Sequence, residues 1–188
     1  MLRADMTPAS AATPPAGSAP PAASRLEPVP PAASRVETVY LVMPGHANVH
    51  GTAFGGTIMQ WTDLCASLAA FRHARLPVVT AAVDQLNFLA PVPIGHICIL
   101  RGQVNAAFRT SMEVGVEVLT EDPCTGAQRL CCEAYLTFVA LGPEGEPRAV
   151  PPLATATEAE RQREADAQAR RAARLALRAR LRDGASGR

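Results

Sequence analysis

The chain has 188 residues, 18 basic and 17 acidic side chains, and a formal charge of +1. This length suits one domain with flanking tails. The near-neutral charge gives no broad electrostatic reason to expect a nucleic-acid or membrane partner. No secretory signal and no apolar run long enough for a membrane span are visible, so we expect a cytoplasmic protein. The five cysteines lack metal-ligand spacing, so we expect mostly buried, reduced thiols and no bound metal.

Proline, alanine and serine dominate residues 1–34. Such a segment has little to bury, so we expect a disordered tail. The expected folded domain covers residues 35–152. It begins with a strand at 35–43, and a loop at 44–54 follows.

The next segment, GGTIMQWTDLCASLAAFRHA (55–74), is small or apolar at almost every position. It predicts a helix that is buried nearly all round. Asp63 lies about two turns inside it, where a carboxylate is costly unless it is paired, hydrogen-bonded or functional. Two interpretations remain open at this stage. Asp63 could act on a carbonyl or a water, or it could be bonded to a backbone N–H or an arginine.

Four strand-like runs follow, at 78–90, 96–107, 111–120 and 128–142. In the third run, valines alternate with Glu113, Gly115 and Glu117, which predicts an apolar inner face and a polar outer face. Asp84 and Glu133 fit half-exposed strand positions in the neighbouring runs. Residues 153–188 form an Arg- and Ala-rich tail, and within it we expect a solvated, partly frayed helix at 156–183.

The order of one strand, one buried helix and four antiparallel strands predicts an α+β fold. The economical arrangement is a curved antiparallel sheet wrapped around one central hydrophobic helix, which is the hotdog fold. One sheet edge stays open in such a protomer. Two protomers are therefore expected to pair edge to edge.

Several residues around the helix start could take part in chemistry. The Gly55-Gly56 pair leaves the first helical N–H groups free for an oxyanion, or it only permits close packing. Asn48 and His50 lie in the preceding loop, where Asn48 could hold a water or carbonyl or only stabilise a turn. Two further groups are candidates. A polar turn that suits a phosphate contains Arg109, Thr110 and Ser111. A possible cleft lies at Asn87 and Phe88, just before a proline.

Four ordered stretches together resemble a known family: MPGHANVHGTAFGGTIMQWTD (43–63), VVTAAVDQLNFLAPVPIG (78–95), FRTSMEVGVEV (108–118) and YLTFVAL (135–141). They are similar to the YciA-type acyl-CoA thioesterases and the cytosolic acyl-CoA hydrolases, which are hotdog proteins. The resemblance covers about residues 36–151, and both tails lie outside it.

The resemblance implies hydrolysis of acyl-CoA to a free acid and coenzyme A, with Asp63 as the catalytic carboxylate and Asn48 in the active site. It implies that the glycines hold the thioester carbonyl and that the turn at 109–111 lies near the CoA phosphates. No cofactor is expected, because coenzyme A is part of the substrate. The expected assembly is a dimer with the site between subunits, within a trimer of dimers. A hotdog hydratase or dehydratase and a non-catalytic acyl-CoA-binding module are the alternatives.

Overall fold

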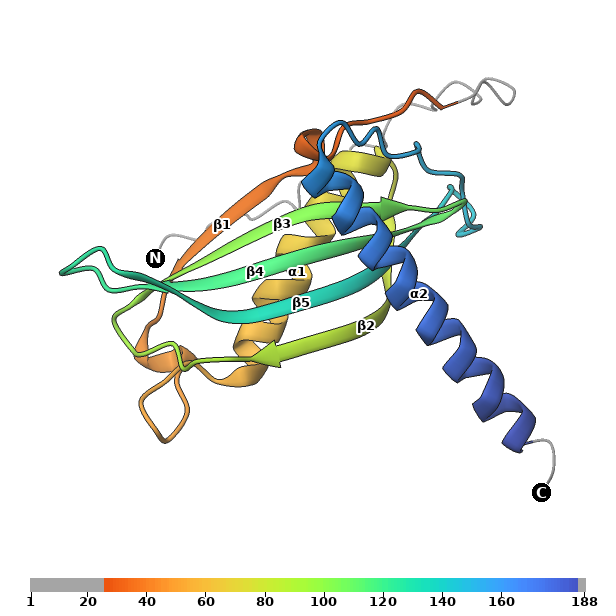
Figure 1. Cartoon of the computed structure of the whole chain (residues 1–188). Coiled ribbons are helices and arrows are strands. Elements are labelled where there is room, and N and C mark those ends of the chain that lie inside the picture. Colours follow the sequence, from red (N-terminus) through yellow and green to blue (C-terminus); the bar gives the residue numbers. More distant parts are fainter. Residues whose placement is uncertain (1–25, 186–188) are drawn as a thin grey trace, which may run out of the picture.

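The computed structural model of the chain describes residues 26–185, with side chains up to Arg182. Five antiparallel strands form one curved sheet in the order β1-β3-β4-β5-β2, and helix α1 lies across its concave face (Figure 1). The strands are β1 (Val36–Leu41), β2 (Val78–Phe88), β3 (Ile97–Ala107), β4 (Ser111–Glu121) and β5 (Gln128–Ala140). This arrangement confirms the predicted α+β hotdog fold. Within the described part of the chain, no helix is both long and apolar enough to cross a bilayer.

Helix α1 (Gly55–Ala74) has the bounds predicted from the sequence. The residue after its end, Arg75, takes a left-handed conformation with φ of 54°, and its N–H donates to the carbonyl of Phe71. The face against the sheet is buried and carries small residues that allow close approach. The opposite face is not covered in the single chain, so the expectation of burial nearly all round is wrong for the isolated chain. Its exposed apolar residues are Met59, Leu64, Leu68 and Phe71.

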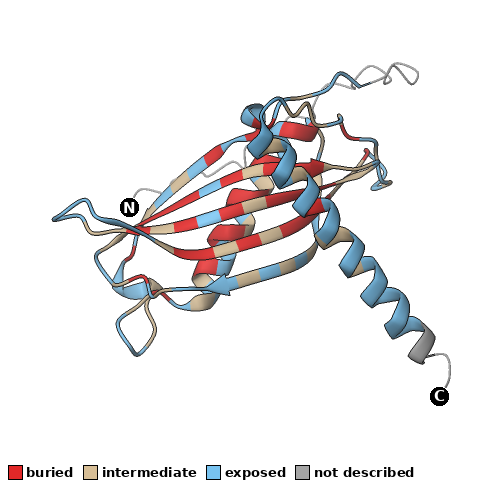
Figure 2. Cartoon of the chain, viewed as in Figure 1, coloured by how far each residue is buried: buried red, intermediate tan, exposed pale blue. Residues whose placement is uncertain are grey.

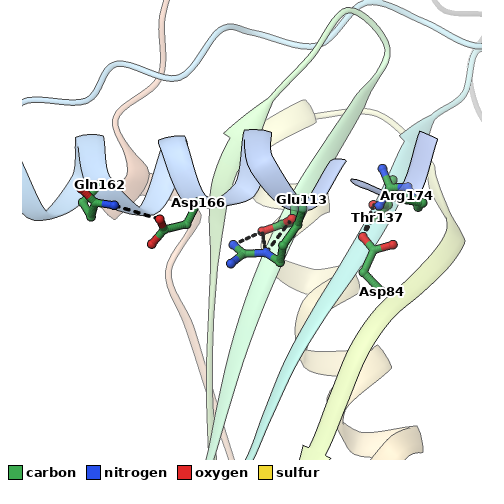
Figure 3. Close-up of polar contacts among 7 residues, drawn as sticks. Asp84, Glu113, Thr137, Gln162, Asp166 and Arg174 are labelled. Atoms are coloured by element: carbon green, nitrogen blue, oxygen red, sulfur yellow. Dashed lines mark hydrogen bonds and ion pairs between the residues drawn. The ribbon is translucent and has the colours of Figure 1, made fainter. Parts of the chain in front are cut away.

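The second long helix, α2 (Glu158–Ala185), crosses the outer face of the sheet, and its far end projects beyond it (Figure 1). Arg170 bonds Glu113 at 2.6 Å, and the side chain of Glu113 is only 2% exposed. Arg174 bonds both Asp84 and Thr137, as Figure 3 shows. The prediction of a solvated tail helix is therefore wrong for this half of α2. Both carboxylates are paired with α2. Glu113 is buried, although the sequence pattern places it on the polar outer face, whereas Asp84 is half-buried, as its strand position predicts.

Part of the expected disordered tail is ordered. A short 3-10 helix, η1 (Pro31–Ser34), precedes β1, and the buried hydroxyl of Ser34 accepts a bond from the Val104 N–H at 2.9 Å. Val29 also forms a parallel bridge with Leu153. The prediction of disorder is wrong for residues 29–34. Residues 1–25 lie outside the described residues.

Four of the five cysteines are buried and free, as the sequence predicts: Cys65, Cys98, Cys131 and Cys132. Burial raises the pKa of Cys98 to about 12 and that of Cys132 to about 11. Thiols with such pKa values stay protonated and are poor nucleophiles. These cysteines therefore serve as small core residues. Figure 2 shows the buried stretches of the sheet and of α1 that make up this core.

The buried histidine His73 makes the fold sensitive to acid. Its Nε2 donates to the Pro151 carbonyl at 2.9 Å, while its buried Nδ1 has no partner among the described residues. Burial lowers its pKa below the usual 6.5, against a smaller opposite effect of the Pro151 bond. As the pH falls, the imidazole of His73 is therefore protonated in the unfolded chain before it is protonated in the folded chain. Its contribution to the free energy of unfolding is complete above about pH 6.5 and is lost as the pH drops below that value.

We expect the urea midpoint to decrease between about pH 6.5 and 5 in a way that depends on His73. The His73→Gln variant should have a smaller decrease over this range. The exposed loop residue His50 provides the matched control, and His50→Gln should keep the wild-type pH dependence. Identical pH profiles for wild type and His73→Gln would exclude this histidine as the cause.

Candidate active site

Asp63 lies on the uncovered side of α1 and is half-buried. Its Oδ1 accepts a hydrogen bond of 2.7 Å from the Thr80 hydroxyl of β2. Neither of the structural alternatives, a backbone N–H or an arginine, holds this carboxylate among the described residues. Thr80 was not predicted from the sequence, because a β-branched residue in a strand carries no signal of a functional contact. The β2–β5 register shifts directly after Thr80, which was not predictable from the sequence.

The start of α1 presents free amide groups. Phe54 precedes the helix without a side-chain cap, and the N–H groups of Gly55 and Gly56 have no partner within the described residues. A Cβ at Gly56 would lie 2.5 Å from the Phe54 ring, and one at Gly55 would lie 3.4 Å from Phe88. Gly56 therefore leaves room for the Phe54 ring, whereas a Cβ at Gly55 would make an ordinary contact with Phe88. Free N–H groups at the positive end of a helix suit a developing oxyanion.

An apolar cavity of about 380 Å³ opens beside this helix start. It has no charged lining residue, so it suits an alkyl chain or another apolar group. Phe88 lines it, as the sequence analysis anticipated, whereas Asn87 does not. The lining residues are Ala53, Gly55, Ile58, Phe88, Leu89, Ala90, Pro91 and Val92.

The loop before α1 is closed by Asn48. Its Oδ1 accepts the His50 N–H at 2.9 Å, and its Nδ2 donates to the Thr52 hydroxyl at 3.0 Å. The turn-stabilising alternative for Asn48 is thus present in the single chain. The imidazole of His50 is exposed and makes no bond among the described residues.

The candidate residues divide between the two ends of the sheet. The Thr110 carbonyl accepts the Ala140 N–H, and Thr80 pairs with Phe138, so the turn at 109–111 lies near Asp63. Phe88 pairs with Cys132, and Cys132 and Ala140 are roughly 26 Å apart along β5 at the usual strand rise. Within one chain, the structure therefore brings Arg109, Thr110 and Ser111 to the Asp63 end, and Gly55 and Phe88 to the other.

Strand β2 is an open edge of the sheet next to the uncovered face of α1. In the described residues it pairs with β5 on one side only. Val79, Val83 and Phe88 of β2 are exposed, together with the apolar stripe of α1. An apolar surface beside an unpaired strand is typical of a protein interface.

Comparisons with known sequences place these features in context. The profile of the thioesterase superfamily matches residues 50–127. The uncharacterized acyl-CoA thioester hydrolase YkhA from Bacillus subtilis is 40% identical over 119 residues, which are 63% of this chain and 69% of that protein. Mouse acetyl-coenzyme A thioesterase is 38% identical over 134 residues, which are 71% of this chain. The chain spans only about a quarter of that mouse protein, with 24% of its length matched.

Solved structures are similar as well. An apo-hexameric acyl-CoA thioesterase superposes with a TM-score of 0.79 at 36% identity, over 82% of this chain and 99% of that chain. The Staphylococcus aureus acyl-CoA hydrolase, in complex with butyryl coenzyme A, coenzyme A and coenzyme A disulfide, superposes at 0.78 and 34% identity, over 84% and 96%. Alanine variants of that hydrolase replace an asparagine, an aspartate 15 residues later and a threonine 17 residues after the aspartate.

Proposed function

This chain belongs to the thioesterase superfamily, and we propose that it is an acyl-CoA thioesterase, which hydrolyses acyl-CoA to a free carboxylic acid and coenzyme A. The observation that carries the proposal is the Asp63 carboxylate, which Thr80 holds beside an open, apolar sheet edge. A charged, water-soluble substrate of this kind agrees with the expected cytoplasmic location.

The spacing of three residues supports this assignment. Asn48 precedes Asp63 by 15 residues, and Thr80 follows it by 17. These are the same two intervals that separate the asparagine, aspartate and threonine replaced in the S. aureus hydrolase. We therefore add Thr80 to the site residues as the group that positions Asp63.

In the proposed reaction, Asp63 takes a proton from a water molecule while the water oxygen adds to the thioester carbon. The free N–H groups at the start of α1 stabilise the resulting oxyanion. The carbon–sulfur bond then breaks, and coenzyme A leaves as a thiolate that needs no strong general acid. Direct attack by the carboxylate, through an anhydride, would use the same groups.

The geometry of α1 supports a reaction site built from two chains. Gly56 and Asp63 are separated by seven residues of helix, or about 10 Å along the axis. A general base must lie within about 3 Å of the proton it takes, or within one water of it. One carbonyl therefore cannot reach both groups of one chain. We propose that Asp63 of one protomer faces the helix start of the other across paired β2 edges.

This dimer would cover the apolar stripe of α1 and complete the sheet at β2. Solved relatives from this superfamily include an apo-hexameric acyl-CoA thioesterase and the hexameric thioesterase y2039 from Yersinia pestis. We propose that this chain likewise forms a homohexamer, arranged as a trimer of dimers. Size-exclusion chromatography with light scattering at several concentrations measures the assembly.

The function is tested with a thiol-detecting reagent and a series of acyl-CoA esters of increasing chain length. A thioesterase releases free coenzyme A. A hydratase would change the enoyl absorbance without releasing a thiol, and a binding module would show saturable binding with neither signal. Absence of thiol release across the whole series, from a correctly assembled protein, would refute the proposed hydrolysis.

Thr80 should act through Asp63 rather than on the substrate. We expect Thr80→Val, which keeps the shape but removes the hydroxyl, to lower kcat about tenfold and leave KM almost unchanged. Thr80→Ser restores the hydroxyl and should recover most of the activity. Equal losses in the valine and serine variants would mean that the Asp63 contact is not the cause.

Arg109 is exposed at the Asp63 end of the sheet, where it could bind the phosphates of coenzyme A. We expect Arg109→Ala to raise KM for acyl-CoA about tenfold with little change in kcat. Arg129, exposed on β5, provides the control variant Arg129→Ala. A change confined to kcat would count against a phosphate contact.

A further inference from the structure

A second cavity, of about 580 Å³, lies on the outer face of the sheet, opposite α1 and Asp63. Residues of β1, β3, β4 and β5 form its floor, and Arg163, Asp166 and Arg170 of α2 line its other side. Figure 1 shows α2 crossing this outer face. The proposed hydrolysis uses none of these residues, so the cavity needs a separate explanation.

The floor carries a row of charged residues in register. Glu37 pairs with Arg101, Arg101 with Glu117, and Glu117 with Glu133 on successive strands. Arg101 bonds Glu37 at 2.8 Å, whereas Glu117 and Glu133 have no ion pair among the described residues. Two carboxylates directly opposite each other on adjacent strands repel. A cation between them would remove this unfavourable contact.

The helix side of the cavity adds another carboxylate. Asp166 is exposed and accepts a bond of 2.8 Å from the neutral amide of Gln162 (Figure 3). Of the lining arginines, Arg170 is paired with Glu113. Arg35 donates to the neutral Gln103, and both Arg35 and Arg163 are exposed. The least exposed group without an ion-pair partner in the cavity is thus the Glu133 carboxylate.

A buried amide also lines this cavity. Asn105 is only 5% exposed, and its side chain makes no hydrogen bond among the described residues. The absent side chain of Gly115 makes room for it, because a Cβ there would lie 2.5 Å from the Asn105 Nδ2. Among the described residues, the fully buried polar atoms without a partner do not include those of Asn105, so its amide reaches into the cavity. A ligand N–H would supply the missing partner for its carbonyl oxygen.

We propose that this outer cavity binds a small organic cation of the aliphatic polyamine class. One ammonium group would lie between Glu117 and Glu133, and a second N–H group would donate to Asn105. The volume fits a chain of several atoms rather than a single ion. The described residues also include no group of three or more His, Cys, Asp or Glu arranged to hold a metal.

The test is isothermal titration of the full chain with spermidine at constant ionic strength. We expect one saturable site per chain. The double variant Glu117→Gln/Glu133→Gln should weaken binding at least about thirtyfold, because it removes two charge-assisted hydrogen bonds. Asn105→Ala should weaken it several-fold. Glu121→Gln, on the same strand but outside the cavity, is the matched control and should change affinity less than twofold.

The proposal is overturned if spermidine gives no saturable heat, or if Glu121→Gln weakens binding as much as the double variant does. Binding of inorganic phosphate in place of spermidine would likewise overturn it, because it would assign the cavity to an anion. Thermal unfolding of each variant checks that the fold is retained. Since the readout is binding and not hydrolysis, the outcome does not depend on the proposed enzymatic activity.

Discussion

The Asp63→Asn variant is expected to hydrolyse acyl-CoA about 10²–10⁴ times more slowly than the wild-type protein, which is the usual contribution of a general base. Asparagine has nearly the same shape as aspartate, and its carbonyl oxygen can still accept the Thr80 hydroxyl bond seen at 2.7 Å. The variant should therefore fold and assemble normally. The loss should appear in kcat, measured by thiol release under saturating substrate.

Two controls make this result specific. Glu144→Gln removes an exposed carboxylate in the turn after β5, which makes no bond to Asp63 or Thr80, and it should keep full activity. Unchanged oligomer size and melting temperature in Asp63→Asn would separate a chemical defect from a structural one. Near-normal turnover in Asp63→Asn would remove this residue from the mechanism, whatever the family likeness.

Mixing two inactive variants would test the placement of the site between protomers. If Asp63 of one chain acts at the helix start of the other, a chain with Asp63→Asn can still offer its Gly55-Gly56 end to a wild-type Asp63. The same chain carries an intact Asn48 loop. Heterodimers of Asp63→Asn with a chain disabled only at the helix start should therefore regain one working site.

The parts of the fold that depend on short sequence patterns were predictable. The run of small and apolar residues at 55–74 predicted the bounds of α1 to the residue. The alternation of valines with charged residues in β4 gave the correct inner face. Each of these signals is local, because it depends only on residues a few positions apart along the chain.

The contacts that were missed join residues distant in sequence. Arg170 and Glu113 are 57 positions apart, and Arg174 and Asp84 are 90 apart. An arginine-rich helix with few leucines has no apolar stripe that predicts packing against a sheet. Helix α2 packs through ion pairs instead, and these leave no such pattern in the sequence. Thr80 was missed for the same reason, since only the fold places its hydroxyl beside Asp63.

The exposed stripe on α1 has a different origin. The sequence predicted a helix apolar on every side, and one side is uncovered in the single chain. A second protomer would cover that side, so the sequence pattern describes the assembly and not the isolated chain. The same surface borders Asp63, which links the proposed dimer to the proposed catalytic site.

Removing Arg170 is expected to cause the largest loss of stability. The Arg170→Met variant keeps the length of the side chain but leaves the Glu113 carboxylate, only 2% exposed, without its partner. An uncompensated buried charge typically costs 3–5 kcal/mol. The Arg170 side chain is 23% exposed, so this ion pair is only partly buried. We therefore expect a loss of about 3 kcal/mol, at the lower end of that range.

The measurement is urea unfolding followed by fluorescence of Trp61, the single tryptophan, at one fixed protein concentration, since assembly also contributes to stability. Arg161→Ala removes the exposed pair with Glu158 on the same helix, and it should leave the midpoint almost unchanged. The double variant Glu113→Leu/Arg170→Met removes both charges and should recover more than half of the loss. If Arg170→Met and Arg161→Ala shift the midpoint equally, the buried pair does not anchor α2 to the sheet.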